Sequence, residues 1–382
     1  MKKVLAIVMA AMMVMALFAG CQNSGGDSNV IKVGNSGPLT GDYAVYGVAV
    51  ANGLELAFEE INALGGLQFE VNAQDDEADG EKAVNAYNNL ITWGMQIMAG
   101  PTTSGSAAAT AAECVKDSVF MLTPSASDAA VIATGDNIFQ ICFSDPNQGI
   151  GSADYIYSHN LASKVGVIYD SSNPYSAGIY AKFKARADEL GLNIACAEAF
   201  TNANKSDLSA QVTKCRDAGC DLVFLPIYTT EAAQVLAYAN KIGYETKFFG
   251  CDGLDGILNV ENFDATLAEG VLLLTPFDAS ADDAKTQAFV EKYTQRYGEV
   301  PNQFAADGYD VAYAIYEACK ACGVTPDMSA EEICAILVEK FTSGDFKFSG
   351  LTGENMTWGE DGAVSKLPMA VKIENGVYVG AE

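Results

Sequence analysis

The chain has 382 residues, of which 49% are hydrophobic and 36 are glycine, a composition typical of a globular protein with about two domains. Its formal net charge of -27 excludes the basic surface that nucleic-acid binding requires, so no nucleic-acid partner is expected. An acidic surface mainly favours solubility and says little about the ligand.

The first 21 residues have the pattern of a signal peptide. Lys2 and Lys3 precede an apolar run of about 17 residues, which is at the short limit for a membrane span. The ending LFAGC resembles a bacterial lipoprotein cleavage box, although Phe18 replaces the usual leucine. Cys21 is therefore the expected lipidation site, with simple secretion or retention as a span as alternatives. Residues 22–29 are polar and typical of a flexible tether.

The cysteine count argues against a disulfide framework. Once Cys21 is lipidated, nine of the ten cysteines remain, and an odd number cannot all pair within one chain. The C-x-x-C sequence from Cys319 to Cys322 lies inside a helical pattern, whereas a redox pair usually lies at a strand-to-helix turn. We expect free thiols that pack as small hydrophobic groups, among them Cys114, Cys142, Cys319 and Cys334.

From residue 30 onward, short apolar runs alternate with amphipathic helical patterns. The run VIKVG leads to a predicted helix from Val45 to Ala63, which Gly65 and Gly66 end. The next predicted strands, most with a helix behind them, are LQFEVNAQDD, MQIMAGP, SVFMLTP, KVGVIYD, CDLVFLPIY and TKFFGCDG. This alternation predicts an α/β fold with mostly parallel sheets covered by helices on both faces.

Three places have the pattern of crossings between two lobes. They are the segment around Asp145, where Pro146 restricts the preceding residue, the segment near Pro276, and the turn-rich stretch 349–362. We therefore predict a first lobe made of residues 30–145 and 277–355. Residues 146–276 and 356–382 then form the second lobe.

Two predicted strand ends carry small hydroxyl side chains just before a helix. Ser104 follows MQIMAGP, and the trio Ser125, Ala126 and Ser127 follows SVFMLTP. Ligands of open parallel sheets bind at such strand ends, and helix N-termini attract carboxylates. These loops therefore predict a carboxylate site. The alternative is that the serines are only helix N-caps, which is their commonest role.

Three other strand ends present Tyr175, Tyr228 and Asp252. Asp252 has no basic neighbour in the sequence, so its carboxylate is available for an ammonium group. The alternative is that the rings cover a core edge and that Asp252 is an ordinary turn residue beside Gly253. Together with the hydroxyl loops, the first interpretation predicts a cleft that holds a zwitterion.

Several motifs, taken in order, resemble those of the bacterial branched-chain amino-acid binding proteins, the Leu/Ile/Val-type receptors of ABC importers. They are IKVGNSGPLTGDYAVYG, NGLELAFEEINALGG, GPTTSG, TPSASD, YDSSNPYSAG and MTWGEDG. The resemblance extends from Val30 to about Tyr378. It implies a type I periplasmic-binding-protein fold, in which two α/β lobes joined by three hinge crossings close on a ligand.

The resemblance also implies roles for single positions. Ser104 matches the family serine that binds the ligand carboxylate, and Ser125 matches a position that contributes a backbone group. Ser127 replaces a threonine with a similar hydroxyl. Tyr175 and Tyr228 fall where the far lobe supplies aromatic rings.

At the amino-group end the chain departs from the leucine-type receptors. Asp252 stands where they carry a glutamate, so the ammonium group must approach more closely or bind through water. Tyr46 replaces a tryptophan or tyrosine that covers the ligand side chain, and Phe304 lines the same pocket. Asp307 is expected to add a second acid near the pocket. The identity of the ligand side chain stays open.

The resemblance implies a monomeric receptor, anchored by its lipid on the outer face of the cell membrane or periplasmic, that delivers an amino acid to an ABC permease and ATPase. A branched-chain or other apolar amino acid is the first expectation, and a small amide or neutral solute is the alternative. No enzyme, cofactor or metal site is expected. The single histidine, His159, lies in a helical pattern, and nucleophile-elbow, dinucleotide and Walker A motifs are missing from the sequence.

Overall fold

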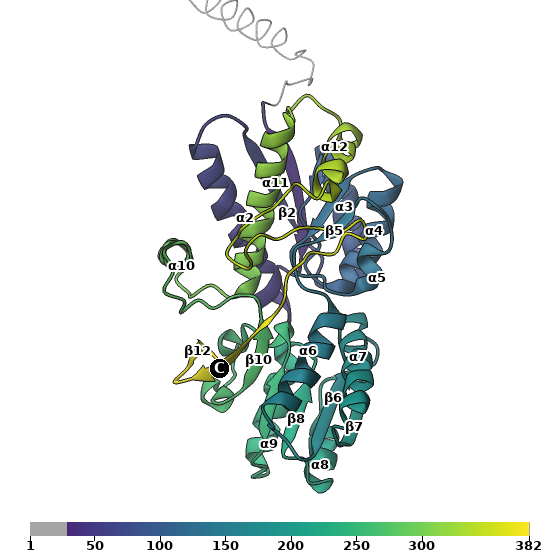
Figure 1. The fold of residues 1–382 in the computed structure, drawn as a ribbon, viewed down its shortest axis with the longest axis vertical. Helices are drawn as coiled ribbons and strands as arrows, with labels where there is room; N and C mark the ends of the chain where they lie inside the picture. The colour runs from purple at the N-terminus through teal and green to yellow at the C-terminus, as the bar shows by residue number, and fades with distance from the viewer. Residues whose placement is uncertain (1–28, 382) are drawn as a thin grey trace, which may run out of the picture.

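The structure is a computed structural model that describes residues 29–381. The predicted signal peptide, Cys21 and nearly all of the tether lie outside the described residues. Between residues 29 and 381, no helix combines the length and the apolar character needed to cross a membrane. The α/β prediction is confirmed: two separate sheets, each flanked by helices, lie one above the other in Figure 1.

The first lobe contains a parallel five-stranded sheet in the order β2-β1-β3-β4-β5. Its strands are β1 (Ile31–Gly37), β2 (Phe69–Asp75), β3 (Ile97–Met98), β4 (Phe120–Thr123) and β5 (Ile138–Gln140). The helices of this lobe are α2 (Ala44–Ala63), α3 (Gly80–Trp93), α4 (Ser104–Lys116), α5 (Ala129–Ile132), α10 (Ala284–Tyr297), α11 (Gln303–Cys322) and α12 (Ala330–Thr342).

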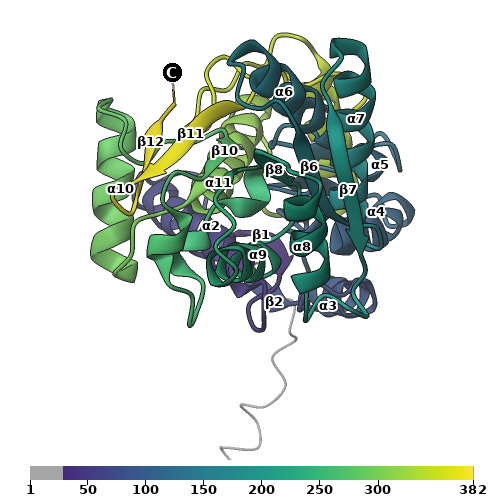
Figure 2. The same cartoon turned by 90° about the horizontal axis from the view of Figure 1, so that it is seen from below.

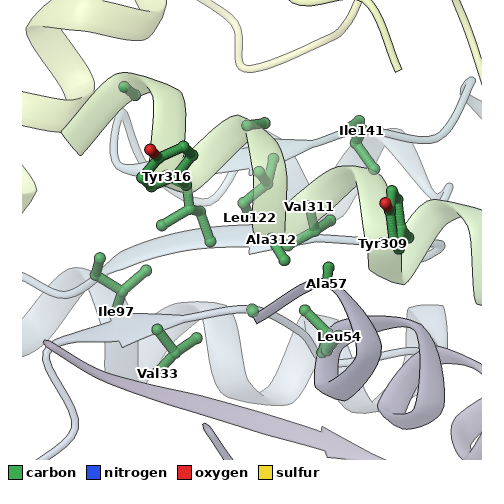
Figure 3. Packing of buried hydrophobic residues seen from close by; sticks show 14 of the residues in the cluster. Val33, Leu54, Ala57, Ile97, Leu122, Ile141, Tyr309, Val311, Ala312 and Tyr316 are labelled. Atoms are coloured by element: carbon green, nitrogen blue, oxygen red, sulfur yellow. The ribbon is translucent and has the colours of Figure 1, made fainter. Parts of the chain in front are cut away.

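Helices cover both faces of this sheet because successive strand residues point to opposite sides. Ile97 and Leu122 pack with residues of α2 and α11, as Figure 3 shows, and belong to the same core cluster as residues of α12. The adjacent Met98 and Met121 pack with α3 and α4. Strands that are buried on both faces have near-continuous apolar sequences, which is why the sequence revealed them so clearly.

The second lobe contains a seven-stranded sheet in the order β12-β11-β10-β9-β8-β6-β7, seen from below in Figure 2. Five neighbouring strands are parallel: β6 (Val165–Asp170), β7 (Ile194–Phe200), β8 (Leu222–Leu225), β9 (Lys247–Gly250) and β10 (Leu272–Thr275). An antiparallel pair, β11 (Met369–Glu374) and β12 (Val377–Gly380), extends one edge. One face is covered by α6 (Asp145–Ser158) and α7 (Pro174–Leu190), and the other by α8 (Ser209–Asp217) and α9 (Thr229–Lys241).

The sequence placed the third crossing at 355/356, but the segment that follows this point packs on the first lobe. Met356, Trp358 and Val364 are buried in the core of the first lobe, and the Trp358 indole donates a hydrogen bond to the Gln140 carbonyl at 2.8 Å. The chain enters the second sheet only at Met369. We therefore propose 368/369 instead of 355/356 as this boundary. Turn-rich composition marks the turn but not the lobe on which it packs.

Helices α2 and α11 approach each other closely at two glycines. A Cβ atom on Gly53 would collide with the carbonyl oxygen of Ala305, and one on Gly308 would lie 2.5 Å from that of Val50. The two helices can pack at this distance only because both positions lack a side chain. Since α2 and α11 also carry Tyr46 and Phe304, this contact fixes one wall of the cleft described below.

Replacing Gly53 with alanine is expected to destabilise the first lobe, because overpacking of a close contact costs about 1–3 kcal/mol. Denaturant unfolding measures the change. Gly151→Ala in α6 is the matched control, because its Cβ would meet Leu274 at an ordinary 3.5 Å. A Gly53→Ala protein as stable as the Gly151→Ala protein would contradict the packing argument.

Candidate functional site

Residues that follow the carboxyl ends of five strands, together with two helix side chains, line one small cavity between the lobes. Its volume is about 20 Å³, the space of roughly one water molecule, so the cleft is closed around it. The first lobe contributes residues after β3 and β4, and the second lobe contributes residues after β6, β8 and β9. The lining residues are Tyr46, Thr102, Thr103, Ser104, Ser125, Tyr175, Tyr228, Asp252, Gly253 and Phe304.

Seven of the nine predicted ligand-binding residues line this cavity: Tyr46, Ser104, Ser125, Tyr175, Tyr228, Asp252 and Phe304. Ala126 and Ser127 stand behind the wall. The Ala126 amide donates to the Thr123 hydroxyl at 3.0 Å, and the Ser127 hydroxyl accepts from the Gln148 amide at 3.5 Å. Both residues are fully buried, and neither is among the residues that line the cavity.

Thr102, Thr103 and Gly253 also line the cavity, although they were not among the predicted ligand-binding residues. The two threonines belong to the same hydroxyl-rich loop as Ser104, so that loop was a signal that could have found them. Gly253 carries no side-chain chemistry. Its place in the wall depends on the turn that follows β9, which no local pattern reveals.

The first-lobe wall consists of two loops that hydrogen bonds tie together. The Ser125 hydroxyl donates to the Thr102 carbonyl at 2.7 Å, and the Ser104 hydroxyl accepts from the Asp128 amide at 3.3 Å. Thr103 is the N-cap of α4, and its buried hydroxyl oxygen has no hydrogen-bond partner among residues 29–381. Unpaired helix N–H groups beside free hydroxyls are suited to binding a carboxylate.

The second-lobe wall pairs a carboxylate with aromatic rings. The Tyr175 hydroxyl donates to Asp252 Oδ1 at 2.8 Å and accepts from the Gly253 amide at 2.9 Å, which fixes the acid in place. The rings of Tyr175 and Tyr228 stack, with centroids 5.0 Å apart. This wall therefore consists of one carboxylate, that of Asp252, surrounded by aromatic rings.

Asp252 is only 3% exposed, and the groups that hydrogen-bond its carboxylate, the Tyr175 hydroxyl among them, are neutral. Burial raises the pKa of Asp252 to about 7, against the opposing effect of the Tyr175 hydrogen bond. A cation placed in the cavity would favour the charged form and lower this pKa again. The site thus has an unmet preference for positive charge.

Asp307, expected as a second acid near the pocket, does not line the cavity, although its charge is close enough to contribute to the raised pKa of Asp252. The Asp307 side chain is 1% exposed and pairs with the equally buried Lys366, whose Nζ lies 3.1 Å from Asp307 Oδ1. Lys366 also donates to the Thr352 hydroxyl at 2.5 Å. Because a buried carboxylate that is already paired has no need of a second cation, Asp307 is part of the support between α11 and the third crossing.

The aromatic side of the cavity also joins the two lobes. The Tyr46 hydroxyl, from α2 of the first lobe, donates to the Gly253 carbonyl at 2.6 Å and accepts from the Thr229 amide at 2.8 Å. Its ring packs against Phe304 with centroids 4.8 Å apart and against Tyr228 at 5.2 Å. Tyr46 therefore closes the cavity and bonds both lobes.

A second contact between the lobes, which we call the clasp, consists of Tyr43, Lys205 and Glu231. The Tyr43 hydroxyl donates to Glu231 Oε1 at 2.7 Å and accepts from Lys205 Nζ at 2.8 Å. Lys205 Nζ also lies 3.6 Å from Glu231 and 4.6 Å from the centre of the Tyr43 ring. Burial raises the pKa of Glu231, so the neighbouring lysine and tyrosine are needed to hold its charge.

His159 and the two cysteines of the C-x-x-C sequence lie outside the cavity lining. His159 ends α6 on the surface, and Cys319 and Cys322 both belong to α11. The nine cysteines of the described chain are unpaired. Within residues 29–381, no group of three or more histidine, cysteine, aspartate or glutamate side chains could hold a metal ion.

The clasp is expected to hold the lobes closed. Tyr43→Phe removes two hydrogen bonds, each worth about 0.5–1.5 kcal/mol net, and should shift the population toward an open form. Small-angle X-ray scattering should then give a larger radius of gyration than for the wild type. Tyr157→Phe, at an exposed ring on α6, is the control and should leave the radius unchanged. Equal radii for all three proteins would show that the clasp does not hold the lobes together.

Asp252 is expected to make stability depend on pH. Its folded pKa of about 7 lies above the unfolded value of 3.8, so the folded state binds more protons between these values, and stability falls as pH rises through this window. Asp252→Asn should therefore stabilise the unliganded protein at pH 8 by on the order of 2–4 kcal/mol, and hardly at all near pH 4. Thermal unfolding across pH tests this, with the exposed Asp282→Asn as control. Parallel pH profiles for wild type and Asp252→Asn would contradict it.

Comparison with known proteins agrees with this geometry. A family model described as a periplasmic binding protein matches residues 30–376. The Leu/Ile/Val-binding protein homolog 3 of Brucella melitensis is 29% identical over 307 residues, which cover 78% of this chain and 81% of the relative. The leucine-, isoleucine-, valine-, threonine- and alanine-binding protein of Pseudomonas aeruginosa is 26% identical over 313 residues, or 81% and 83% of the two chains.

Solved structures show the same architecture. The leucine binding protein LivK of Thermotoga maritima superposes with a TM-score of 0.82 at 25% identity, covering 92% of this chain and 98% of its own. LivJ of Streptococcus pneumoniae, solved in complex with isoleucine, gives 0.81 at 28% identity, with 92% and 99% covered. Because the family model spans nearly the whole described chain, the chain belongs to the periplasmic binding protein family.

Proposed function

We propose that the protein is the substrate receptor of an ABC importer and binds an apolar amino acid, in the first instance a branched-chain one, between its two lobes. The observation that carries this proposal is the pairing of two unlike walls across one cavity. Hydroxyls and a helix N-terminus lie on one side, and a buried carboxylate lies on the other. This arrangement complements a zwitterion, and the relatives above are named for amino acids of this class.

In this proposal the ligand carboxylate binds the first lobe. The hydroxyls of Ser104 and the unpartnered Thr103 donate to it, together with the Ser125 backbone amide and the free N–H groups at the start of α4. The partial positive charge of that helix end adds to the attraction. Hydrogen bonds to an ionised acceptor are roughly twice as strong as those between neutral groups, which favours a carboxylate over a neutral carbonyl here.

The ligand ammonium binds Asp252. Burial makes the charged form of this acid costly, and the ammonium group offsets the cost, so binding releases a proton near neutral pH. A ligand without the ammonium group leaves Asp252 buried without a cation. Removing one partner of such a pair costs about 2–5 kcal/mol, which gives the site its selectivity for amino acids.

The ligand side chain lies against Tyr46, Tyr228 and Phe304. These rings supply an apolar surface, and Tyr46 and Tyr228 come from opposite lobes. A cavity of about 20 Å³ cannot admit an amino acid unless the lobes separate first. We therefore propose that ligand enters an open cleft and that hinge closure brings the rings together around it.

We also propose where the protein is held and which importer subunits it contacts. The signal pattern and Cys21 favour a lipid anchor on the outer face of the cell membrane, with the receptor presenting its ligand as a monomer to a permease and ATPase. Family membership supports an extracytoplasmic receptor that binds a substrate and does not transform it.

One observation favours a second candidate, a receptor for a small amide or other neutral solute. With a pKa of about 7, Asp252 is partly protonated at neutral pH and can donate a hydrogen bond to a neutral carbonyl.

Binding experiments distinguish the two candidates. After partial unfolding removes any co-purified ligand, the protein is titrated with L-leucine, L-isoleucine and L-valine, with the amides of these amino acids, and with the matching carboxylic acids that lack the amino group. We expect thermal stabilisation by at least one amino acid, amounting to about 2.7 kcal/mol at a hundredfold excess over Kd, and none by the acids. If no amino acid stabilises the protein and an amide does, the second candidate is favoured.

Asp252→Ala should weaken amino-acid binding by about thirtyfold or more, the equivalent of at least 2 kcal/mol, while the protein stays folded. Asp255→Asn is the matched control. Asp255 is a buried neighbour whose pKa burial also raises to about 7, but it bonds the Gln303 amide and does not line the cavity. Wild-type affinity in Asp252→Ala, measured by calorimetry, would refute the ammonium role.

A further inference from the structure

Three thiols meet in the second lobe, far from the cleft. Cys196 lies in β7, Cys215 in α8, and Cys220 just before β8. Their meeting point is Gly166 of β6, where a Cβ atom would lie 3.0 Å from Cys215 Sγ and 3.1 Å from Cys220 Sγ. The absence of a side chain at Gly166 is what gives these sulfur atoms room.

Two of the three sulfur atoms are in direct contact. Cys215 Sγ and Cys196 Sγ are 3.7 Å apart, with the Cys215 S–H donating. A disulfide bond is about 2.05 Å long, so the two atoms need to approach by about 1.7 Å. Side-chain rotation has to supply this movement, and Cys196 and Cys215 already belong to the same packed cluster. Figure 2 shows β7 at the edge of the sheet with α8 beside it.

Exposure makes Cys196 the member of the pair that a dissolved oxidant can reach. It is partly exposed, whereas Cys215 is 0% and Cys220 3% exposed. Its S–H donates to Glu198 Oε1 at 3.8 Å, and Lys214 pairs with the same carboxylate at 2.7 Å. A dissolved oxidant therefore reaches Cys196 first, and Cys215 is in position to attack it next.

We propose that Cys196 and Cys215 form a dithiol that closes to a disulfide and fastens the edge strand β7 to α8. The oxidant belongs to the class of low-molecular-weight disulfides. An exported protein meets oxidising conditions in which such bonds form and persist, and export is what the N-terminal sequence predicts.

The chemistry proceeds by two thiol–disulfide exchanges. The Cys196 thiolate attacks one sulfur of the oxidant, forming a mixed disulfide and releasing one small thiolate. The Cys215 thiolate then attacks Cys196 Sγ, which forms the protein disulfide and releases the second small thiolate. The two cysteines lose two electrons, the oxidant gains them, and the two cysteine protons end on the two small thiols.

The reaction is expected to be slow and its product structural. Burial raises the pKa of Cys196 and of Cys215, and it raises that of Cys220 to about 11, so little thiolate is present at neutral pH. Gly166 is near the amino end of β6, whereas the cleft follows the carboxyl end of the same strand. The bond should therefore stabilise the lobe without changing ligand affinity.

The test uses the whole chain, purified reduced and incubated natively with oxidised glutathione. Free thiols are then alkylated, and digested peptides are mapped by mass spectrometry. We expect a cross-linked peptide that joins Cys196 to Cys215 and a thermal midpoint several degrees above that of the reduced protein. Cys196→Ser and Cys215→Ser should lose both the cross-link and the rise in the midpoint.

Cys220→Ser is the matched control, because it removes a thiol of the same cluster and should keep the cross-link. The proposal is overturned if Cys196 and Cys215 both remain alkylatable, if Cys215 is joined to Cys220 instead, or if the bond forms only in denaturant. None of these readouts depends on ligand, so they are independent of the transport proposal.

Discussion

A carboxylate buried without a cation is the constraint on which the rest of the site depends. Asp252 follows β9 after a single intervening residue. Its carboxylate accepts a hydrogen bond from the neutral hydroxyl of Tyr175. Water would hold its charge at little cost, whereas the closed cleft raises its pKa to about 7. Closure is thus costly for the empty protein in the charged form, and a ligand cation reverses that cost.

The fold explains how such a group is held. Parallel strands deliver their carboxyl ends to one edge of each sheet, so five loops from two sheets meet at one cavity. The first lobe turns a helix N-terminus and hydroxyls toward it, and the second lobe turns an acid and rings toward it. The groups suited to a carboxylate therefore lie on one lobe, and the group suited to an ammonium lies on the other. A zwitterion can contact both sets of groups only when the cleft is closed.

Two tyrosine hydroxyls of the first lobe bond to the second lobe, where they would otherwise bond to water. The Tyr46 hydroxyl donates a hydrogen bond to the Gly253 carbonyl, and the Tyr43 hydroxyl donates one to the Glu231 carboxylate. Both bonds join the first lobe to the second. The buried pair of Asp307 and Lys366, close to the third crossing, is of another kind. It is satisfied within the structure and supports the hinge side without needing a ligand.

The sequence by itself determined the α/β class, most strand positions and seven of the cavity-lining residues, because buried parallel strands leave continuous apolar runs whose ends can be read directly. Only the tertiary structure decided that Ala126 and Ser127 stand behind the wall, that Thr103 and Gly253 stand in it, and that Met356, Trp358 and Val364 pack on the first lobe. It alone paired Tyr43 with Glu231 across 188 residues and Asp307 with Lys366 across 59. Such contacts depend on how two lobes face each other, and no local periodicity encodes a distance between segments so far apart in the chain.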